Sequence, residues 1–389
     1  MEHRSTDGMK GKDAKVVHLT SVHPPFDNRI FHKQCRTLAE SEYEVVLVAP
    51  ADQSQVRDGV RIRAVPRAGN RFARMLLTTW RVFLAGLAEK GDIYHFHDPE
   101  LIPVALLLRA LGKRVVYDVH EDNVTSIMQK RYLPRIVRMV LAKVFGWFEL
   151  SASRAFTVVL AERYYSRRFP AGVQILNYPR RDFFEFGGSA LERETIPESV
   201  EQTTRLIYTG SVTIDRGALI YAKMVAEMPN ISITVVGQCS PELAAEMRRV
   251  AGDGASRLEI IGEGTFVPFS EIAAIYRSRK WTAGLAIFPE TPHYVEKELT
   301  KFFEYMAAGI PILASNFPAW RQLIEGNGVG LCVDPEDMGS IRGAIEKLAR
   351  DEGCVIKMGH NGRRAVAERF NWDVEGKKLL NLYDKLMMA

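Results

Sequence analysis

The segment from Glu296 to Pro311 carries the strongest chemical signal in the chain. It reads Glu-Lys-Glu-Leu-Thr-Lys-Phe-Phe-Glu-Tyr-Met-Ala-Ala-Gly-Ile-Pro and follows an expected strand. Thr300 can cap a short helix that Gly309 ends, and the unpaired N–H groups of a helix start form a ready anion site. A carboxylate beside that site, such as Glu304, could accept paired hydrogen bonds from a ribose diol. A solvated acidic helix start would have the same spacing.

A second signal is the stretch from Tyr208 to Gly217, a glycine-containing turn between an expected strand and an expected helix. Gly210 and Ser211 lie in the turn, and Arg216 stands where the helix begins. A cation there could neutralise a departing diphosphate, and charge placed in advance where charge develops is usually a large catalytic contribution. An ordinary surface arginine in such a turn would look the same.

Three strand ends in the first half of the chain carry further polar groups. Ligand loops of parallel sheets follow the strands, so these residues are candidates for contacts with an acceptor or donor. Histidine suits acid–base chemistry at neutral pH, although at a strand end it is more often a hydrogen-bonded core residue. The candidates are His23, Asp27, Arg29, His97, Asp98, His120 and Glu121.

These segments resemble a known family. Glu296 and Glu304, with seven residues between them, are similar to the EX7E motif of retaining GT-B glycosyltransferases, specifically glycosyltransferase family 4 (GT4). The sequence Phe-Phe-Glu-Tyr-Met-Ala-Ala-Gly-Ile-Pro and its continuation through residues 316–335 resemble that family as well. The loop containing His23 is similar to the opening of a GT4 subgroup.

The resemblance implies that a hexose-type sugar moves from a UDP- or GDP-sugar to an acceptor hydroxyl without a metal. It implies that Glu304 binds the ribose hydroxyls, that Glu296 lies near the transferred sugar, and that Lys301 reaches the ribose or phosphates. His120 matches a family position near the sugar and acceptor, which ranks it above His97. The implied catalytic residues are His120, Glu296 and Arg216, and the implied donor-binding residues are Gly210, Ser211, Arg216, Leu299, Thr300, Lys301 and Glu304.

Two departures from the family pattern concern the phosphate contacts. Many members have glycine where this chain has Leu299, and glycine lets the backbone approach a diphosphate closely. The family commonly places two cations in the loop after Tyr208, whereas here Ser211 takes the first place and Arg216 the second. The missing charge could come from Lys301, or hydroxyl groups could take its place.

The elements that must position these residues alternate between short apolar runs and longer amphipathic segments, which is typical of parallel α/β units. We therefore expect a GT-B fold, with two Rossmann-like doubly wound parallel-sheet domains facing a central cleft. In the first domain strands are expected at 15–19, 44–49, 60–65, 93–97, 114–119 and 155–160. In the second they are expected at 205–209, 231–236, 257–261, 283–288, 310–314 and 329–333.

The domain boundaries follow from a change in composition. A stretch with paired glycines, Pro197 and several acidic residues interrupts the pattern and reads as a linker. We expect a disordered N-terminus at 1–14, an acceptor domain at 15–185, a linker at 186–204, a nucleotide-sugar domain at 205–368, and a C-terminal helix at 369–389 that could cross back to the first domain.

The composition of the 389-residue chain is globular, with 47% hydrophobic and 25% charged residues. A net charge of +5 is too modest to indicate nucleic-acid binding. The four cysteines are scattered and no histidine or acidic residues show a metal-binding spacing, so we expect no metal and a reducing compartment. Because no run reaches the ~18–20 apolar residues that span a bilayer, a cytoplasmic protein is expected.

Two basic and apolar segments, at 71–90 and 130–149, resemble helices that lie on anionic bilayers. Burial against the first sheet is the simpler interpretation, because helices of this fold are amphipathic. We expect at most peripheral contact with an anionic membrane, at the inner face of the cytoplasmic membrane. The acceptor implied by the resemblance is a glycan or a lipid-linked glycan, as in polysaccharide biosynthesis.

Two other functions remain open at this point. A sugar-nucleotide epimerase of GT-B fold fits the chain length but not the paired glutamates. A non-catalytic nucleotide-sugar-binding subunit would bind the donor without transferring or hydrolysing it.

Overall fold

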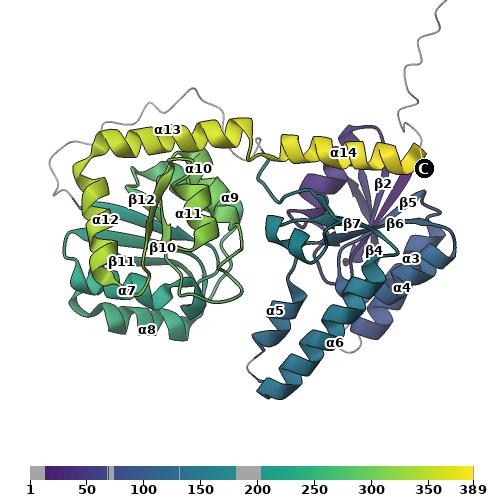
Figure 1. Ribbon diagram of the computed structural model, residues 1–389, viewed down its shortest axis with the longest axis horizontal. Helices are drawn as coiled ribbons and strands as arrows, with labels where there is room; N and C mark the ends of the chain where they lie inside the picture. The colour runs from purple at the N-terminus through teal and green to yellow at the C-terminus, as the bar shows by residue number, and fades with distance from the viewer. Residues whose placement is uncertain (1–13, 68, 70–73, 131, 181–202, 389) are drawn as a thin grey trace, which may run out of the picture. The chain divides into compact units, whose positions relative to one another are not determined.

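The computed structural model describes residues 14–67, 69, 74–130, 132–180 and 203–388, and most of the expected linker lies outside these ranges. The chain divides into two compact units, which are described separately (Figure 1). The first unit comprises Met1–Asn177 and Trp372–Ala389, and the second comprises Tyr178–Asn371. The first unit thus combines the N-terminal part of the chain with its last helical segment.

The first unit is built on an eight-stranded sheet in the order β3-β4-β2-β1-β5-β6-β7-β8. All neighbouring strands are parallel except β3, which runs antiparallel to β4. The two- and three-residue strands β8 and β3 at its edges were not expected from the sequence. The strands are β1 (Lys15–Leu19), β2 (Glu44–Pro50), β3 (Gln55–Arg57), β4 (Val60–Val65), β5 (Ile93–Phe96), β6 (Arg114–Val119), β7 (Thr157–Leu160) and β8 (Val173–Gln174).

Helices cover both faces of this sheet, and its central strands β1, β2, β5 and β6 are accordingly buried along nearly their whole length. Val17 of β1 enters one core together with Phe96, whereas Val16 enters the other core together with Phe31 and Leu379. The helical segments are η1 (Ile30–Cys35), α1 (Arg36–Glu40), η2 (Arg74–Thr78), α3 (Thr79–Ala88), η3 (Pro99–Leu101), α4 (Ile102–Ala110), α5 (Asn123–Met128), α6 (Arg135–Ser153), η4 (Arg163–Arg167) and α14 (Trp372–Met388).

The second unit is built on six parallel strands in the order β11-β10-β9-β12-β13-β14. The strands are β9 (Thr204–Thr209), β10 (Ile231–Cys239), β11 (Leu258–Glu263), β12 (Ala283–Ala286), β13 (Ile312–Ser315) and β14 (Gly330–Val333). The helical segments are η6 (Ile214–Arg216), α7 (Ala218–Glu227), α8 (Pro241–Ala251), η7 (Gly252–Arg257), α9 (Phe269–Ser278), α10 (Thr300–Ala308), α11 (Pro318–Ile324), α12 (Met338–Arg350) and α13 (Glu352–Glu368).

Both sheets have the strand order of a doubly wound Rossmann-like fold, which confirms the expected fold class. The order reverses beside β1 and β5 in the first unit, and beside β9 and β12 in the second. Ligands of such sheets bind beyond the carboxyl ends of the strands at this reversal. A ligand site is therefore expected in the loops after β1, β5, β9 and β12.

Candidate active site

Helix α10 does not begin with the threonine cap that the sequence predicts. Leu299, not Thr300, is the residue that precedes the first helical turn, and no side chain caps that turn. Leu299 is buried and has an extended backbone (φ −74°, ψ 132°) that any residue adopts, so this conformation does not require glycine. Gly309 ends the helix with φ 69°, as predicted. The N–H of Phe302 donates to the carbonyl of Leu299 over 2.9 Å, and the other N–H groups of a first helical turn give it anion-binding character.

Glu304 lies one turn into α10 and is held by a tyrosine from α9. The hydroxyl of Tyr276 donates to Oε2 of Glu304 over 3.0 Å and also lies 2.7 Å from Oγ1 of Thr209 at the end of β9. Burial, followed by the charge of Glu304, raises the pKa of Tyr276 well above its ordinary value, so the phenol stays a hydrogen-bond donor. The carboxylate is thus oriented next to the strand end that begins the loop with Gly210.

Two cations meet beside this carboxylate. The Lys301 ammonium lies 3.6 Å from the centre of the Tyr208 ring, and Nζ has no hydrogen-bond partner among the described residues. Burial, followed by the charge of Arg216, lowers the pKa of Lys301 well below its ordinary value. An anion bound here would satisfy the ammonium and stabilise its charge. Lys301 therefore lies beside the loop after Tyr208, in which the family commonly has a second cation and this chain has Ser211.

Arg216 is anchored at the other side of the same loop. Its Nε donates to the hydroxyl of Tyr294 over 2.9 Å, and Tyr208 donates to the carbonyl of Ser211 over 2.7 Å. The Arg216–Tyr294 bond fixes the loop between β9 and α7 against the loop that precedes α10, and the Tyr208–Ser211 bond stabilises the first of these loops internally. The guanidinium remains partly exposed at the loop surface.

Two glycines let this loop come close to its neighbours. Gly210 has φ +105°, and a Cβ built there would lie 3.6 Å from Nζ of Lys301. Gly217 has φ +83°, and a Cβ there would lie 2.1 Å from the carbonyl oxygen of Ile287 after β12. A side chain at either position would strain the backbone, and at Gly217 it would also push the two loops apart.

Glu296 lies in the loop between β12 and α10 and is half-buried. The loop is fixed on both sides of it, because Tyr294 accepts the bond from Arg216 and the carbonyl of Lys297 accepts a 2.8 Å bond from Trp320 Nε1. The second unit therefore brings together the predicted donor-site residues at the ends of β9 and β12. Spacing gave no signal for Tyr276 and Tyr294, which orient them.

In the first unit, Asp98 organises the loop after β1. Its carboxylate accepts hydrogen bonds from Thr20 Oγ1 (2.7 Å) and the Ser21 N–H (2.6 Å), and lies 2.9 Å from Nδ1 of His23. Burial works against a charge on His23, but the Asp98 carboxylate prevails and raises the pKa of His23 to about 9. Asp98 is itself buried and positions His23.

His120 completes this cluster from the end of β6. Its Nε2 lies 3.3 Å from Nε2 of His23, and its Nδ1 lies 3.1 Å from the carbonyl oxygen of Asp118. Burial lowers the pKa of His120, which favours a neutral imidazole beside the protonated His23. Glu121 follows and is exposed. A carboxylate oxygen of Glu121 lies within 4.8 Å of an imidazole nitrogen of His23 and of His120. His23, His120 and Glu121 are thus the predicted first-unit residues that the structure brings together at a partly accessible position.

The His23 imidazolium makes stability depend on pH. Because its pKa is raised from 6.5 to about 9, its stabilising contribution is complete below about pH 6.5 and is lost as the pH rises through about 9. We expect hydrogen exchange in first-unit peptides to show a stability difference between the wild type and His23→Gln at pH 6 that shrinks by pH 9.5. The exposed His360→Gln serves as the control. A difference that is constant with pH would contradict this assignment.

Arg29 and Asp27 have structural roles that the sequence did not predict. Arg29 is only 3% exposed and donates to both carboxylate oxygens of Asp118, over 2.9 and 2.7 Å. Asp27 Oδ1 accepts the N–H groups of Arg29 and Ile30, which starts η1. The expectation that Arg29 contacts a donor or acceptor is therefore replaced by an internal ion pair with Asp118.

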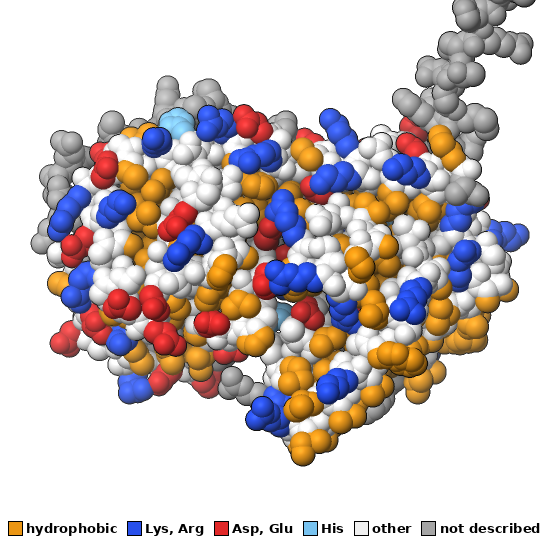
Figure 2. Space-filling view, in the orientation of Figure 1, with side chains coloured by type: hydrophobic (Ala, Val, Ile, Leu, Met, Phe, Trp, Pro, Cys, Tyr) orange, Lys and Arg blue, Asp and Glu red, His pale blue; other side chains and the backbone are white. Residues whose placement is uncertain are grey.

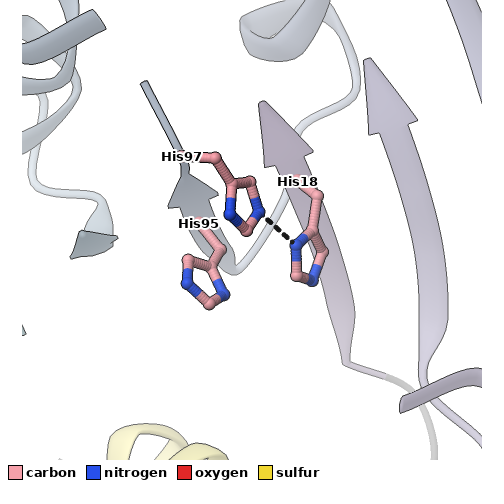
Figure 3. A group of neighbouring side chains, drawn as sticks. All are labelled: His18, His95 and His97. Carbon is pink, nitrogen blue, oxygen red and sulfur yellow. Dashed lines mark hydrogen bonds between the residues drawn. The ribbon is translucent and has the colours of Figure 1, made fainter. Parts of the chain in front are cut away.

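His97 belongs to a buried group with His18 and His95 (Figure 3). Nε2 of His97 lies 3.0 Å from Nδ1 of His18, and its Nδ1 lies 3.1 Å from Asp118, while Nδ1 of His95 lies 2.7 Å from the Tyr383 hydroxyl. The three imidazoles could each offer a nitrogen to a metal, although the His18–His97 contact already uses two of these. The sequence did not reveal the group, because it forms through the pairing of β1 with β5.

Two family models match most of the chain. Residues 28–187 match the glycosyl transferase 4-like domain, and residues 199–365 match glycosyl transferases group 1. The chain belongs to glycosyltransferase family 4. The two matched regions contain the candidate site residues except His23 and Asp27, which precede residue 28. This glycosyltransferase is thus an enzyme, and neither an epimerase nor a non-catalytic subunit is favoured.

Curated relatives of this glycosyltransferase include two mannosyltransferases. The phosphatidyl-myo-inositol mannosyltransferase of Mycolicibacterium smegmatis is 22% identical over 366 residues, which cover 90% of this chain and 88% of that protein. A GDP-mannose-dependent alpha-(1-6)-phosphatidylinositol monomannoside mannosyltransferase of Mycobacterium tuberculosis is 32% identical over 78 residues, or 20% of each chain.

Solved structures confirm the GT-B fold of this glycosyltransferase. Sucrose-phosphate synthase from Thermosynechococcus elongatus superposes with a TM-score of 0.74 at 18% identity, covering 97% of this chain and 100% of that one. Anabaena HepE in complex with UDP gives a TM-score of 0.70 at 11% identity, covering 96% and 100%. At 18% and 11% sequence identity, these similarities show the fold alone.

Proposed function

We propose that the second unit binds a UDP- or GDP-sugar and that a hexose-type sugar passes, with retention of its anomeric configuration, to an acceptor hydroxyl held by the first unit. The observation that carries this proposal is the buried Lys301 ammonium, which has no hydrogen-bond partner among the described residues and lies beside Arg216 and the start of α10. A diphosphate bound here would meet Arg216 and the helix start and would favour the charged form of Lys301.

The donor contacts divide among the site residues. The diphosphate lies against the start of α10 at Leu299 and Thr300, with Lys301 and Arg216 as counter-charges. The backbone of Gly210 and Ser211 borders it. Glu304, oriented by Tyr276, accepts hydrogen bonds from the ribose hydroxyls, and Glu296 holds the transferred sugar. The departing phosphate assists deprotonation of the acceptor.

The two cations also explain why we propose transfer without a metal. They place fixed positive charge where negative charge develops on the leaving diphosphate, and this arrangement needs no reorganisation during the reaction. The structures of Anabaena HepE, which contain UDP and UDP-glucose, support a UDP-sugar as the donor. The mannosyltransferase relatives support GDP-mannose as the alternative donor.

The acceptor is a hydroxyl of a glycan or lipid-linked glycan, at the inner face of the cytoplasmic membrane. A pocket of about 310 Å³ in the first unit supports an acceptor site there. The loop after β1 borders this pocket, and His23 is among the residues that line it. His120, adjacent to His23, is then near the reacting hydroxyl. A relative named for phosphatidyl-myo-inositol supports a lipid acceptor. No helix in the described part of the chain is long and apolar enough to cross a membrane.

The experiment that tests the proposal is a thermal-shift panel of UDP-, GDP-, ADP- and dTDP-sugars, followed by a donor-hydrolysis and transfer assay on each ligand that stabilises the protein. We expect one nucleotide class to raise Tm and to be consumed slowly even without an acceptor. Stabilisation without any hydrolysis or transfer would indicate a binding subunit. Release of an epimerised sugar nucleotide would indicate an epimerase.

Glu304→Ala should weaken donor binding more than it affects the fold. Losing hydrogen bonds to a charged group costs about 1.5–3 kcal/mol, so we expect the donor Kd measured by calorimetry to rise roughly 10- to 100-fold. Glu346→Ala, an exposed glutamate on α12, is the matched control. Unchanged donor affinity in Glu304→Ala would remove this residue from the site.

A further inference from the structure

Helix α6 reverses the burial pattern that is usual for a helix packed on a sheet. The side chains that it buries are small or polar: Ala142, Glu149, Ala152 and Ser153. Its large apolar side chains face outward instead, with Ile136 76% and Trp147 73% exposed. A helix that packs on a core normally buries its large apolar stripe. Phe148 packs against the core of the first unit, but the simpler sequence interpretation, burial of this segment against the first sheet, is wrong for most of its large apolar residues.

The exposed apolar side chains continue onto neighbouring helices of the same unit. Leu76 and Leu77 in η2 and Trp80 in α3 are exposed, and α4 lies between α3 and α6. Figure 2 shows hydrophobic side chains interspersed with basic ones over α6. We call the exposed face of η2, α3, α4 and α6 the apolar-basic surface. It is far more extensive than the scattered apolar residues expected on a soluble protein.

The charges on the apolar-basic surface have one sign. Arg81, Arg135 and Lys143 are exposed there, whereas α3 and α4 contain no acidic residue and α6 contains only Glu149. Glu149 is buried, accepts a 2.6 Å hydrogen bond from Tyr117 and pairs with Arg168. These described helices therefore present no acidic side chain to solvent.

We propose that the apolar-basic surface binds the face of an anionic lipid bilayer. Apolar side chains enter the acyl boundary while Arg81, Arg135 and Lys143 meet lipid phosphates, as in helices that lie in the membrane interface. A second copy of the chain fits less well, because a twofold interface pairs a surface with itself and would bring these like charges together. The bilayer supplies both the apolar phase and the opposite charge.

The pocket of the first unit adjoins this surface. Thr78, which lines the pocket, directly follows Leu76 and Leu77, and the pocket also contains Arg67 and His23. A lipid acceptor whose chains remain in the bilayer could therefore place its polar headgroup in the pocket. This last step rests on the proposed transfer function, whereas binding of the bilayer does not.

The test is co-sedimentation of the full chain with vesicles of phosphatidylglycerol and phosphatidylcholine, compared with vesicles of phosphatidylcholine alone. We expect binding to the anionic vesicles only. The triple variant Arg81→Glu/Arg135→Glu/Lys143→Glu should bind them roughly 100-fold more weakly, given the usual contribution of each basic residue near a membrane. The control Lys347→Glu/Lys357→Glu/Arg364→Glu makes the same charge change at exposed positions of α12 and α13.

Insertion of the apolar residues is tested separately by fluorescence. Among the five tryptophans, all in the described part of the chain, Trp80 and Trp147 are exposed and the other three are buried. Brominated acyl chains in anionic vesicles should quench the wild type, and quenching should be lost in Trp80→Phe/Trp147→Phe. Ile136→Ser/Val140→Ser should bind vesicles more weakly than the control Phe266→Ser/Ile356→Ser, which alters exposed apolar residues of the second unit.

Equal binding by the two charge-reversed triples, or no quenching in bound protein, would overturn the proposal. Dimers that are lost on Ile136→Ser/Val140→Ser, without vesicle binding by the wild type, would assign the surface to a second copy. If vesicle binding holds while no donor sugar is transferred or hydrolysed, the proposed function fails and the surface assignment stands. If sugar is transferred to a soluble acceptor but the protein does not bind vesicles, the surface assignment fails and the proposed function stands.

Discussion

Replacing Arg216 with alanine should lower kcat/KM for sugar transfer by roughly 10²- to 10³-fold, the usual effect of removing one preorganised group that stabilises developing charge. Arg216 is fixed by Tyr294 at the loop surface, close enough to Lys301 to lower its pKa. Its loss leaves one cation for the leaving diphosphate. The measurement is steady-state transfer, or donor hydrolysis if no acceptor has been found.

Arg248→Ala, which removes an exposed arginine of α8, is the matched control for Arg216→Ala. The split between kinetic constants is informative as well. A role in stabilising the leaving group predicts that kcat falls, whereas uniform donor binding would raise KM alone. A variant with wild-type kcat/KM would show that Lys301 and the start of α10 neutralise the diphosphate without Arg216.

Replacing Asp118 with asparagine should lower the free energy of unfolding of the first unit by about 3–5 kcal/mol, the cost of leaving a buried charge without its partner. The carboxylate receives two bonds from Arg29 and one each from Gln34 and His97. Burial alone would raise the pKa of Asp118, but Arg29 and these bonds hold it well below its ordinary value. The substitution therefore strands the Arg29 guanidinium.

Hydrogen exchange resolved by peptide is the suitable measurement for Asp118→Asn, because the two units need not unfold together. Protection should fall in β1, β5 and β6 and stay unchanged in β9 to β14. Asp52→Asn, at an exposed position of the first unit, should leave both units unchanged. Equal loss of protection in the two units, or none, would contradict a local role for the ion pair.

The fold was predictable because its central strands, such as β1, β2, β5 and β6, are buried on both sides and so read as nearly continuous apolar runs. The starts and ends expected for β1, β4 and β6 coincide with those observed. The edge strands β3 and β8 were missed because two or three residues with partial exposure carry no such pattern. Length and burial, more than propensity, decided which strands could be recognised.

The sequence suggests candidate site residues only where they are close together along the chain. The segment around Glu304 and the turn with Arg216 are candidates of this kind, because each lies within one loop and helix start. The ion pair between Arg29 and Asp118, and the tyrosines that hold Glu304 and Arg216, depend on strand order and helix packing. Local spacing cannot reveal contacts between residues that are about 30 to 90 positions apart.

Because α14 packs into the first unit through Trp372, Leu379 and Tyr383, the second unit is in effect an insertion within the first. Chimeras that exchange donor specificity between relatives should therefore transplant residues 178–371 as one cassette and retain the recipient's own final helix. A simple two-part fusion at the middle of the chain would pair a sheet with a foreign α14, so its failure would say nothing about the compatibility of the two substrates.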